Sequence, residues 1–152
     1  VVTGNGSFSS PNSVTVTQSD GSQKIIGFQH AVIAAGSQAI KLPGLPWGDP
    51  RLMDSTDALE LADTSGKLLV IGGGIIGLEM ACVYDALGSD VTVVEWLDQL
   101  MPGADPDLVR PLQQRIGKRY GGIHLKTKVA SIEARPDGLL ATFKGEKAPP
   151  PT

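Results

Sequence analysis

Three glycines in the stretch LLVIGGGIIGLEM have the spacing of a phosphate-binding turn. Gly72, Gly74 and Gly77 form the pattern G-x-G-x-x-G. The apolar run before them predicts a strand, and the residues after them predict a helix. Gly72 would permit the tight turn, Gly74 would let a pyrophosphate approach the backbone, and Gly77 would let the helix pack closely on the sheet. The helix N-terminus would offer free N–H groups to phosphates. The candidate binding residues of this turn are Gly72, Gly73, Gly74, Ile75, Ile76 and Gly77.

An acidic residue stands where a ribose-binding residue would be expected. Glu95 ends the predicted strand DVTVVE, 21 residues beyond Gly74. A carboxylate there can accept hydrogen bonds from both ribose hydroxyls. It would also repel a 2′-phosphate, and the next three residues, Trp96 to Asp98, offer no cation. The pattern therefore favours NAD(H) over NADP(H) or FAD. The alternative is a tight strand-to-helix turn that binds no ligand.

A second acid, Glu79, lies inside the predicted helix. At helical spacing it shares a face with Cys82, Val83 and Ala86, so it stands at one end of an apolar stripe. One interpretation is an acid placed favourably near a helix N-terminus. The other is a buried site acid whose cationic partner is not evident. The residues alone leave both open, whereas the apolar neighbours of Cys82 predict a core position for that thiol.

The elements around the turn predict an α/β architecture. Strand, glycine turn, helix and strand together span about 30 residues, the size of one βαβ unit, which predicts two parallel strands. That helix is expected to end at Gly88. The Pro- and Gly-rich stretch KLPGLPWGDP suggests a domain boundary near Leu42, which divides the chain into residues 1–42 and 43–152.

Other local signals predict the remaining elements. Before the boundary we expect a hairpin formed by NSVTVTQ and QKIIGF and a buried strand in HAVIAAG. After it we expect a short helix capped by Ser55 or Thr56 and a longer helix capped by Asp105. IHLKTKV should form a strand, ASIEARPDGLLATFKG should form a hairpin turning at Pro136-Asp137-Gly138, and KAPPPT should have no packed structure.

Composition narrows the function classes. The net charge of −3 gives no electrostatic case for a nucleic acid or an anionic membrane surface as partner. One cysteine and two histidines, His30 and His124, do not suggest a metal site or an internal disulfide. No apolar run approaches the roughly 20 residues needed to span a bilayer. We expect a cytoplasmic protein and, because VVTGNG resembles the middle of a strand, a fragment of a longer one.

Several of these stretches together resemble the flavoprotein disulfide reductases. GGGIIGLEM, VVE, AVIAAGS, DSTDALEL and DQLMPGADPD carry the resemblance, which is greatest to the dihydrolipoyl dehydrogenases. It implies a homodimeric flavoenzyme that oxidises dihydrolipoamide, carried on an acyltransferase component of a 2-oxo acid dehydrogenase complex. Electrons would pass through a redox disulfide and FAD to NAD⁺. The implied fold is a β-rich remnant of an FAD domain in residues 1–42 and, in residues 43–152, a Rossmann-like NAD-binding domain with a parallel sheet and a β-hairpin or meander, incomplete at its C-terminal end.

The resemblance also implies roles for individual residues. Gly72 to Gly77 and Glu95 would bind NAD, and Val129 would contact its adenine. Gly6, Ala35 and Gly36 would lie near the FAD of the full-length parent. Glu79 would lie at the flavin–nicotinamide junction and pair with a lysine beside the redox disulfide.

The family's redox cysteine pair, that lysine and the catalytic His–Glu pair are not in this chain. We therefore expect no catalytic residue here, an inactive fragment that does not retain FAD, and a Glu79 that is exposed or paired locally. We also expect a monomer, because the resemblance implies a family that dimerises mainly through a separate interface domain. Two alternatives stay open. One is a fragment of a glutathione or mercuric reductase, and the other is a noncatalytic nucleotide-binding module.

Overall fold

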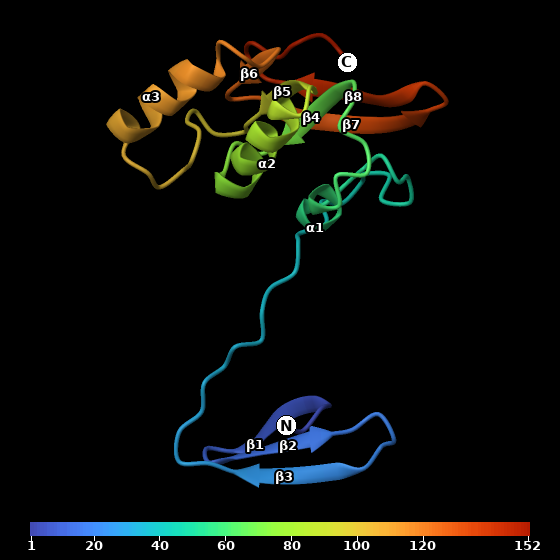
Figure 1. Ribbon diagram of the computed structural model, residues 1–152, viewed down its shortest axis with the longest axis vertical. Coiled ribbons are helices and arrows are strands. Elements are labelled where there is room, and N and C mark those ends of the chain that lie inside the picture. The colour runs from blue at the N-terminus through green and yellow to red at the C-terminus, as the bar shows by residue number, and fades with distance from the viewer. The chain divides into compact units, whose positions relative to one another are not determined.

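The computed structural model describes residues 1–152, which form two compact units, Val1–Gln38 and Ala39–Thr152 (Figure 1). The division falls four residues before the boundary expected near Leu42. That the two units belong to an FAD-binding and an NAD-binding domain stays a prediction. No helix of the chain is both long and apolar enough to cross a membrane.

The N-terminal unit is an antiparallel sheet of three strands. Its strands are β1 (Asn5–Ser10), β2 (Ser13–Thr17) and β3 (Gln23–Gly27), paired in that order. The expected hairpin is therefore confirmed as β2 and β3. The strand expected in HAVIAAG is wrong, because residues 30–36 are exposed and form no strand. A strand exists only when a neighbour satisfies its backbone N–H and C=O groups, and no strand pairs with this segment.

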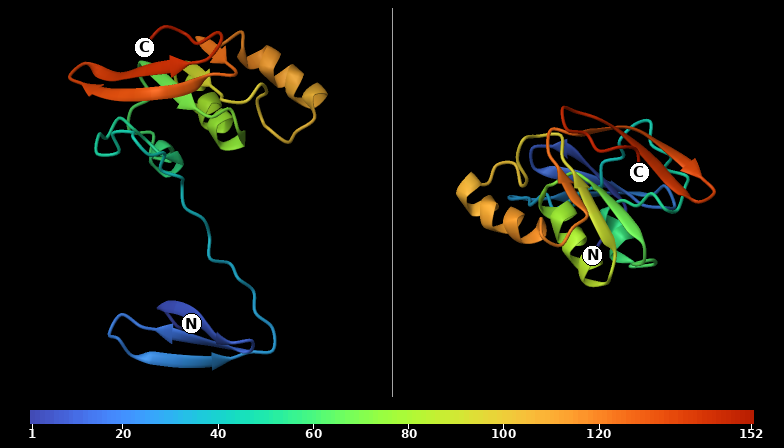
Figure 2. Two further views of the ribbon diagram at one scale, coloured as in Figure 1. Left: turned by 180° about the vertical axis from the view of Figure 1, so that it is seen from behind. Right: turned by 90° about the horizontal axis from the view of Figure 1, so that it is seen from above.

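The larger unit is built on a parallel sheet. Its strands are β4 (Lys67–Ile71), β5 (Asp90–Val94) and β6 (Gly122–His124), in the order β4-β5-β6. Helix α2 (Ile75–Ala86) connects β4 to β5 and packs against both strands, and helix α3 (Pro106–Ile116) precedes β6 (Figures 1 and 2). The predicted parallel βαβ unit is confirmed, with Val70 opposite Val93.

A hairpin completes the unit. Strands β7 (Lys128–Arg135) and β8 (Gly138–Lys144) pair antiparallel with Arg135 opposite Gly138, so the turn lies where it was predicted. The single strand expected in IHLKTKV is wrong. The chain leaves β6 after His124, turns at Lys126 with φ +51°, and starts β7 at Lys128. In the tail, Thr152 exchanges two backbone hydrogen bonds with Ala141 of β8, although no packed structure was expected there.

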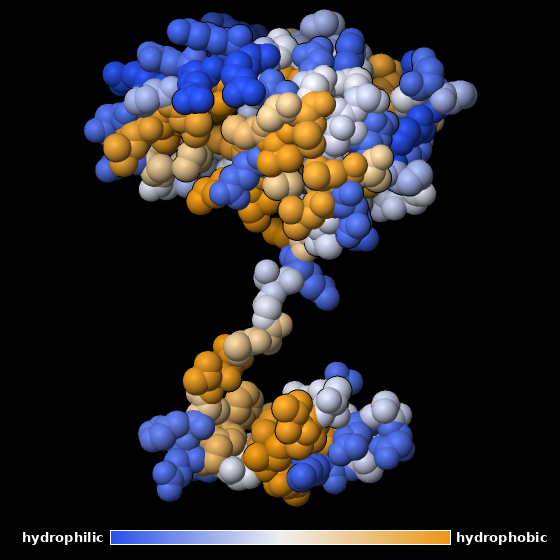
Figure 3. Space-filling view, viewed as in Figure 1, coloured by the Kyte–Doolittle hydropathy of each residue, from blue (hydrophilic) through white to orange (hydrophobic).

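One apolar core holds these elements together. Helix α2 contributes Leu78, Ala81 and Tyr84, and the remaining buried members are Val91, Val93, Leu100, Val109, Ile116 and Tyr120. The face of α2 that includes Cys82 is exposed, so the predicted core position of this thiol is wrong. Because α2 is apolar on nearly all sides, its sequence periodicity did not identify which face is buried. Figure 3 shows the resulting apolar surface over α2, to which Ile75, Ile76 and Val83 contribute.

Helix α1 (Ser55–Leu59) is capped by Asp54 rather than by Ser55 or Thr56. The Asp54 Oδ1 accepts hydrogen bonds from the N–H groups of Thr56 at 2.8 Å and Asp57 at 3.1 Å. The Asp54 N–H donates to the Asp57 carboxylate. Reciprocal bonds of this kind satisfy N–H groups that have no partner within the helix. The Oη of the buried Tyr84 donates to the Ala58 carbonyl at 2.9 Å, which attaches α1 to α2.

The Asp54 cap predicts a pH-dependent change in α1. The backbone N–H groups of Asp57 and Thr56 lower the pKa of Asp54 below 3.8. A lowered pKa means that the stabilisation is complete above pH 3.8 and is lost as the pH falls through the folded value. In an NMR titration, the Thr56 and Asp57 amide resonances should therefore move with a midpoint below pH 3.8. Asp54→Asn keeps a capping oxygen without this titration, and an unchanged titration in that variant would contradict the assignment.

Candidate functional site

The turn between β4 and α2 presents open backbone. Gly72 has φ +107°, a conformation that side chains disfavour. Gly74 is the N-cap of α2, so it supplies no side-chain hydrogen bond to the first turn. The N–H groups of that turn lack acceptors within the helix and carry the positive end of its dipole. The turn can therefore accept an anionic group of a ligand.

Glu95 holds this turn from the end of β5. Its Oε2 accepts the N–H of Gly73 at 2.7 Å, and its Oε1 accepts the N–H of Leu97 at 2.7 Å. The residue is only 8% exposed. Each carboxylate oxygen accepts one of these hydrogen bonds and has a second lone pair. Glu95 thus orders the turn and keeps acceptor capacity beside it.

A side chain added at each of three glycines of the turn would meet different surroundings. A Cβ on Gly77 would collide with the backbone carbonyl oxygen of Gly72, and one on Gly73 would collide with the buried side chain of Leu100. A Cβ on Gly74 would meet no heavy atom within 4 Å. Gly77 and Gly73 are therefore required by packing, whereas Gly74 leaves open space in front of the turn.

The other predicted NAD-site residues lie on α2 and β7. Glu79 is exposed on α2, which confirms its predicted exposure. Val129 is half-buried on β7, opposite Phe143. Ile75 and Ile76 are each 61% exposed at the start of α2. Their roles toward a nucleotide remain predictions.

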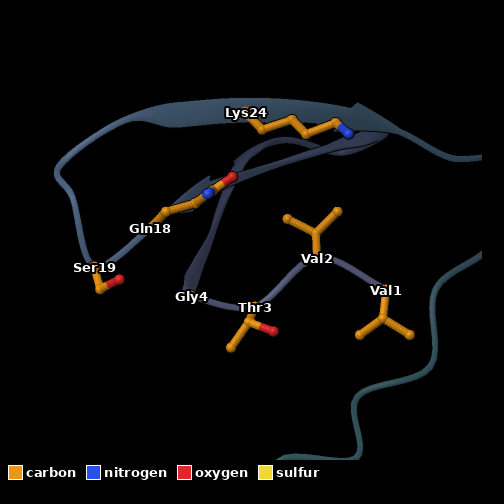
Figure 4. Close-up of a pocket in the computed structure, with 7 residues that line it drawn as sticks. All are labelled: Val1, Val2, Thr3, Gly4, Gln18, Ser19 and Lys24. Atoms are coloured by element: carbon orange, nitrogen blue, oxygen red, sulfur yellow. The ribbon is translucent and has the colours of Figure 1, made fainter.

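The three residues expected near FAD all lie in the N-terminal unit. Gly6 is exposed on β1, opposite Val16. Ala35 and Gly36 lie in the exposed segment that forms no strand, and Gly36 has φ +72°. Figure 4 shows a separate hollow in this unit, lined by Val1 to Gly4, Gln18, Ser19 and Lys24. It contains none of the residues predicted to bind a cofactor.

Cys82 contacts a buried phenol instead of a second thiol. Its Sγ lies 3.3 Å from Oη of Tyr120. Burial, and then the hydrogen bond to Cys82, raise the pKa of Tyr120 above its usual value of 10. The phenol is therefore neutral at physiological pH, and next to it Arg119 and Asp85 form an ion pair. This cluster connects α2 to the segment after α3 and has a structural role.

Two neighbours of the candidate site residues were not found from the sequence. Lys128 lies with its Nζ 5.3 Å from the ring centroid of Trp96, so a cation does stand next to the residue that follows Glu95. Leu100 is fully buried against Gly73. The apolar type of Leu100 was a signal for burial, but nothing in the local sequence links Trp96 with a residue more than 30 positions away.

The glycine contacts predict unequal costs for two alanine substitutions. Gly77→Ala should destabilise the fold by about 1–3 kcal/mol, because its new methyl group meets backbone that cannot rotate away. Gly73→Ala should cost less, because its methyl group meets the end of the Leu100 side chain rather than backbone, and a side-chain end can shift more readily. Thermal or urea unfolding of both variants measures the difference. If Gly73→Ala proved the more destabilising, the described packing of Gly77 would be contradicted.

Comparison with known proteins places these features in a family. The profile of the family described as Pyridine nucleotide-disulphide oxidoreductase matches residues 1–148. The chain is 50% identical to the dihydrolipoyl dehydrogenase of Vibrio cholerae over 149 residues, which are 98% of this chain and 31% of that protein. It is 44% identical to the dihydrolipoyl dehydrogenase of Haemophilus influenzae over 96% of this chain and 30% of that protein.

A solved structure has the same fold. The HOCl-induced flavoprotein disulfide reductase RclA of Escherichia coli superposes with a TM-score of 0.74 at 26% identity, covering 95% of this chain and 32% of that one. The chain thus spans about a third of the length of the curated relatives it matches. The profile match over nearly all of its residues shows that the chain belongs to the pyridine nucleotide-disulphide oxidoreductase family.

Proposed function

We propose that the chain is the NAD(H)-binding portion of a dihydrolipoyl dehydrogenase. The observation that carries this proposal is the turn at Gly74, which is open to a ligand and is held from the adjacent strand by the Glu95 carboxylate. The names of the curated relatives favour a dihydrolipoyl dehydrogenase over a glutathione or mercuric reductase.

Each part of the turn has a task in this proposal. The pyrophosphate lies over Gly74, where no Cβ keeps it away, and accepts hydrogen bonds from the N–H groups at the start of α2. The ribose hydroxyls donate to the free lone pairs of Glu95. Val129 contacts the adenine, and Glu79 lies at the flavin–nicotinamide junction of the full-length parent. NAD⁺, when bound, supplies the hydride acceptor.

The remaining chemistry belongs to the full-length parent. In the proposal, that parent is a cytoplasmic homodimer that carries FAD and takes dihydrolipoamide from an acyltransferase component. Oxidising a dithiol through an enzyme disulfide requires two cysteines, and this chain has one, Cys82. The 152-residue chain alone is therefore proposed to have no dehydrogenase activity. It is also proposed to be a monomer. Gly6, Ala35 and Gly36 would contact FAD only as parts of the parent.

The open space at Gly74 predicts a variant that folds but does not bind. Gly74→Ala should change the free energy of unfolding by less than about 1 kcal/mol, because its φ of −76° suits alanine and a methyl group meets no neighbour. Binding of NADH should weaken, because the methyl group occupies the space proposed for the pyrophosphate. Isothermal titration with NADH, combined with thermal unfolding, checks both parts. NADH affinity equal to that of the unsubstituted chain would contradict the proposed phosphate position.

The Glu95 charge predicts a cofactor preference. The unsubstituted chain should bind NADH more tightly than NADPH, because the carboxylate repels a 2′-phosphate. Glu95→Gln removes the charge and should lower the ratio of NADH to NADPH affinity. The ratio is the informative quantity, because loss of the hydrogen bonds to Gly73 and Leu97 would affect the affinities for both nucleotides. Equal or tighter NADPH binding by the unsubstituted chain would disprove the preference.

A further inference from the structure

We propose that the adenine of the bound dinucleotide stacks on the indole of Trp96 and that Lys128 orients this indole. This inference rests on the proposed function, because it adds a stacking surface for the base to the proposed pyrophosphate and ribose sites and to the proposed contact of Val129 with the adenine. It assigns a binding role to two residues that are far apart in the sequence and that lie together in the fold.

The position of Trp96 follows from the chemistry of the ligand. In an adenosine, the base is attached to C1′, next to the carbon that bears the 2′-hydroxyl. A nucleotide whose ribose hydroxyls reach Glu95 must therefore place its base just beyond Glu95, on the side away from the pyrophosphate. The indole of Trp96 extends from the next residue of the chain, and the Leu97 N–H bonded to Glu95 fixes the backbone on its other side.

The backbone around Trp96 is ordered by neighbouring residues. The N–H of Thr127 donates to the Glu95 carbonyl at 2.9 Å, and the N–H of Lys126 donates to the Leu97 carbonyl at 2.8 Å. These bonds hold the two segments side by side. They place Lys128, at the start of β7, with its ammonium 5.3 Å from the Trp96 ring centroid. The indole thus has a defined place in the free protein.

Trp96 has a large surface that the fold itself does not use. The residue is 62% exposed, although indole is among the largest apolar side chains. The chain offers an internal comparison in Trp47, which also has a lysine ammonium near its ring, Lys41 at 5.4 Å. The Trp47 indole donates a hydrogen bond to the Leu42 carbonyl at 2.8 Å, whereas the Trp96 indole has no such bond. Trp47 is therefore fixed as a structural residue, and Trp96 keeps an exposed aromatic face available to a base.

Fluorescence of a single-tryptophan chain tests the inference directly. In a Trp47→Phe variant, Trp96 is the only source of indole emission. Titration with AMP and with ADP-ribose should quench this emission, because both carry the base, whereas nicotinamide mononucleotide should leave it unchanged. ADP-ribose that binds by calorimetry without altering Trp96 emission would overturn the stacking role.

Affinity measurements separate this inference from the proposed function. Trp96→Ala should weaken the binding of ADP-ribose and of NADH by roughly 5-fold to 150-fold, the range that corresponds to the loss of one base–aromatic stack. Trp96→Phe should retain most of the affinity, and Trp47→Phe should retain all of it. If the unsubstituted chain binds ADP-ribose and Trp96→Ala binds it equally well, only the stacking role is overturned. If the unsubstituted chain binds neither ADP-ribose nor NADH, the proposed function fails, and the inference fails with it.

Lys128→Met tests the orienting role. This variant should bind ADP-ribose less tightly than the unsubstituted chain but more tightly than Trp96→Ala, because the indole remains but loses its cation. It should also shift the Trp96 emission maximum in the absence of ligand. Unchanged emission and unchanged ADP-ribose affinity in Lys128→Met would remove Lys128 from the proposal.

Discussion

The Glu95 carboxylate is the interaction on which the proposed site depends. It joins the N–H of Gly73 in the turn after β4 to the N–H of Leu97 in the loop after β5, at 2.7 Å each. A buried carboxylate is tolerated where hydrogen bonds replace its lost hydration, and here two backbone donors do so. The same residue therefore shapes the turn and, in the proposed function, would also bind the ribose of the ligand. Its substitution affects folding and binding together, which is why a ratio of nucleotide affinities is more informative than one affinity.

Features encoded by adjacent residues could be predicted from the sequence. The turn at Pro136-Asp137-Gly138 and the end of α2 at Gly88, which has φ +108°, follow from local residue types, and the structure has both. The parallel pairing of β4 and β5 follows from the length of the connection between them. The spacing from Gly74 to Glu95 placed the acid at the correct strand end. It did not reveal that Glu95 also binds the turn itself, because that depends on backbone directions in three dimensions.

Features that depend on tertiary partners could not be predicted in this way. Helix α2 is apolar on most sides, so its buried face is chosen by packing, and Cys82 lies outside the core. Residues 30–36 have the composition of a buried strand but no neighbour with which to pair. The contact of Lys128 with Trp96 requires the break after β6, where Lys126 adopts φ +51°. The residue type of Lys126 does not indicate this conformation. The position of the Lys128 ammonium near the proposed adenine site therefore could not be predicted from the sequence.

The most direct test of the proposed site is an NMR titration of the ¹⁵N-labelled chain with NADH. Changes in amide chemical shift should concentrate at Gly72–Gly77, next to the proposed position of the pyrophosphate, and at Glu95–Leu97, next to the proposed position of the ribose. The core strand β5 before Glu95 should change little, because Val91 and Val93 are fully buried. If the amides of Gly72–Gly77 do not move at millimolar NADH, or if the shifts concentrate instead around the hollow beside Lys24, the assignment of this turn as the nucleotide site is contradicted.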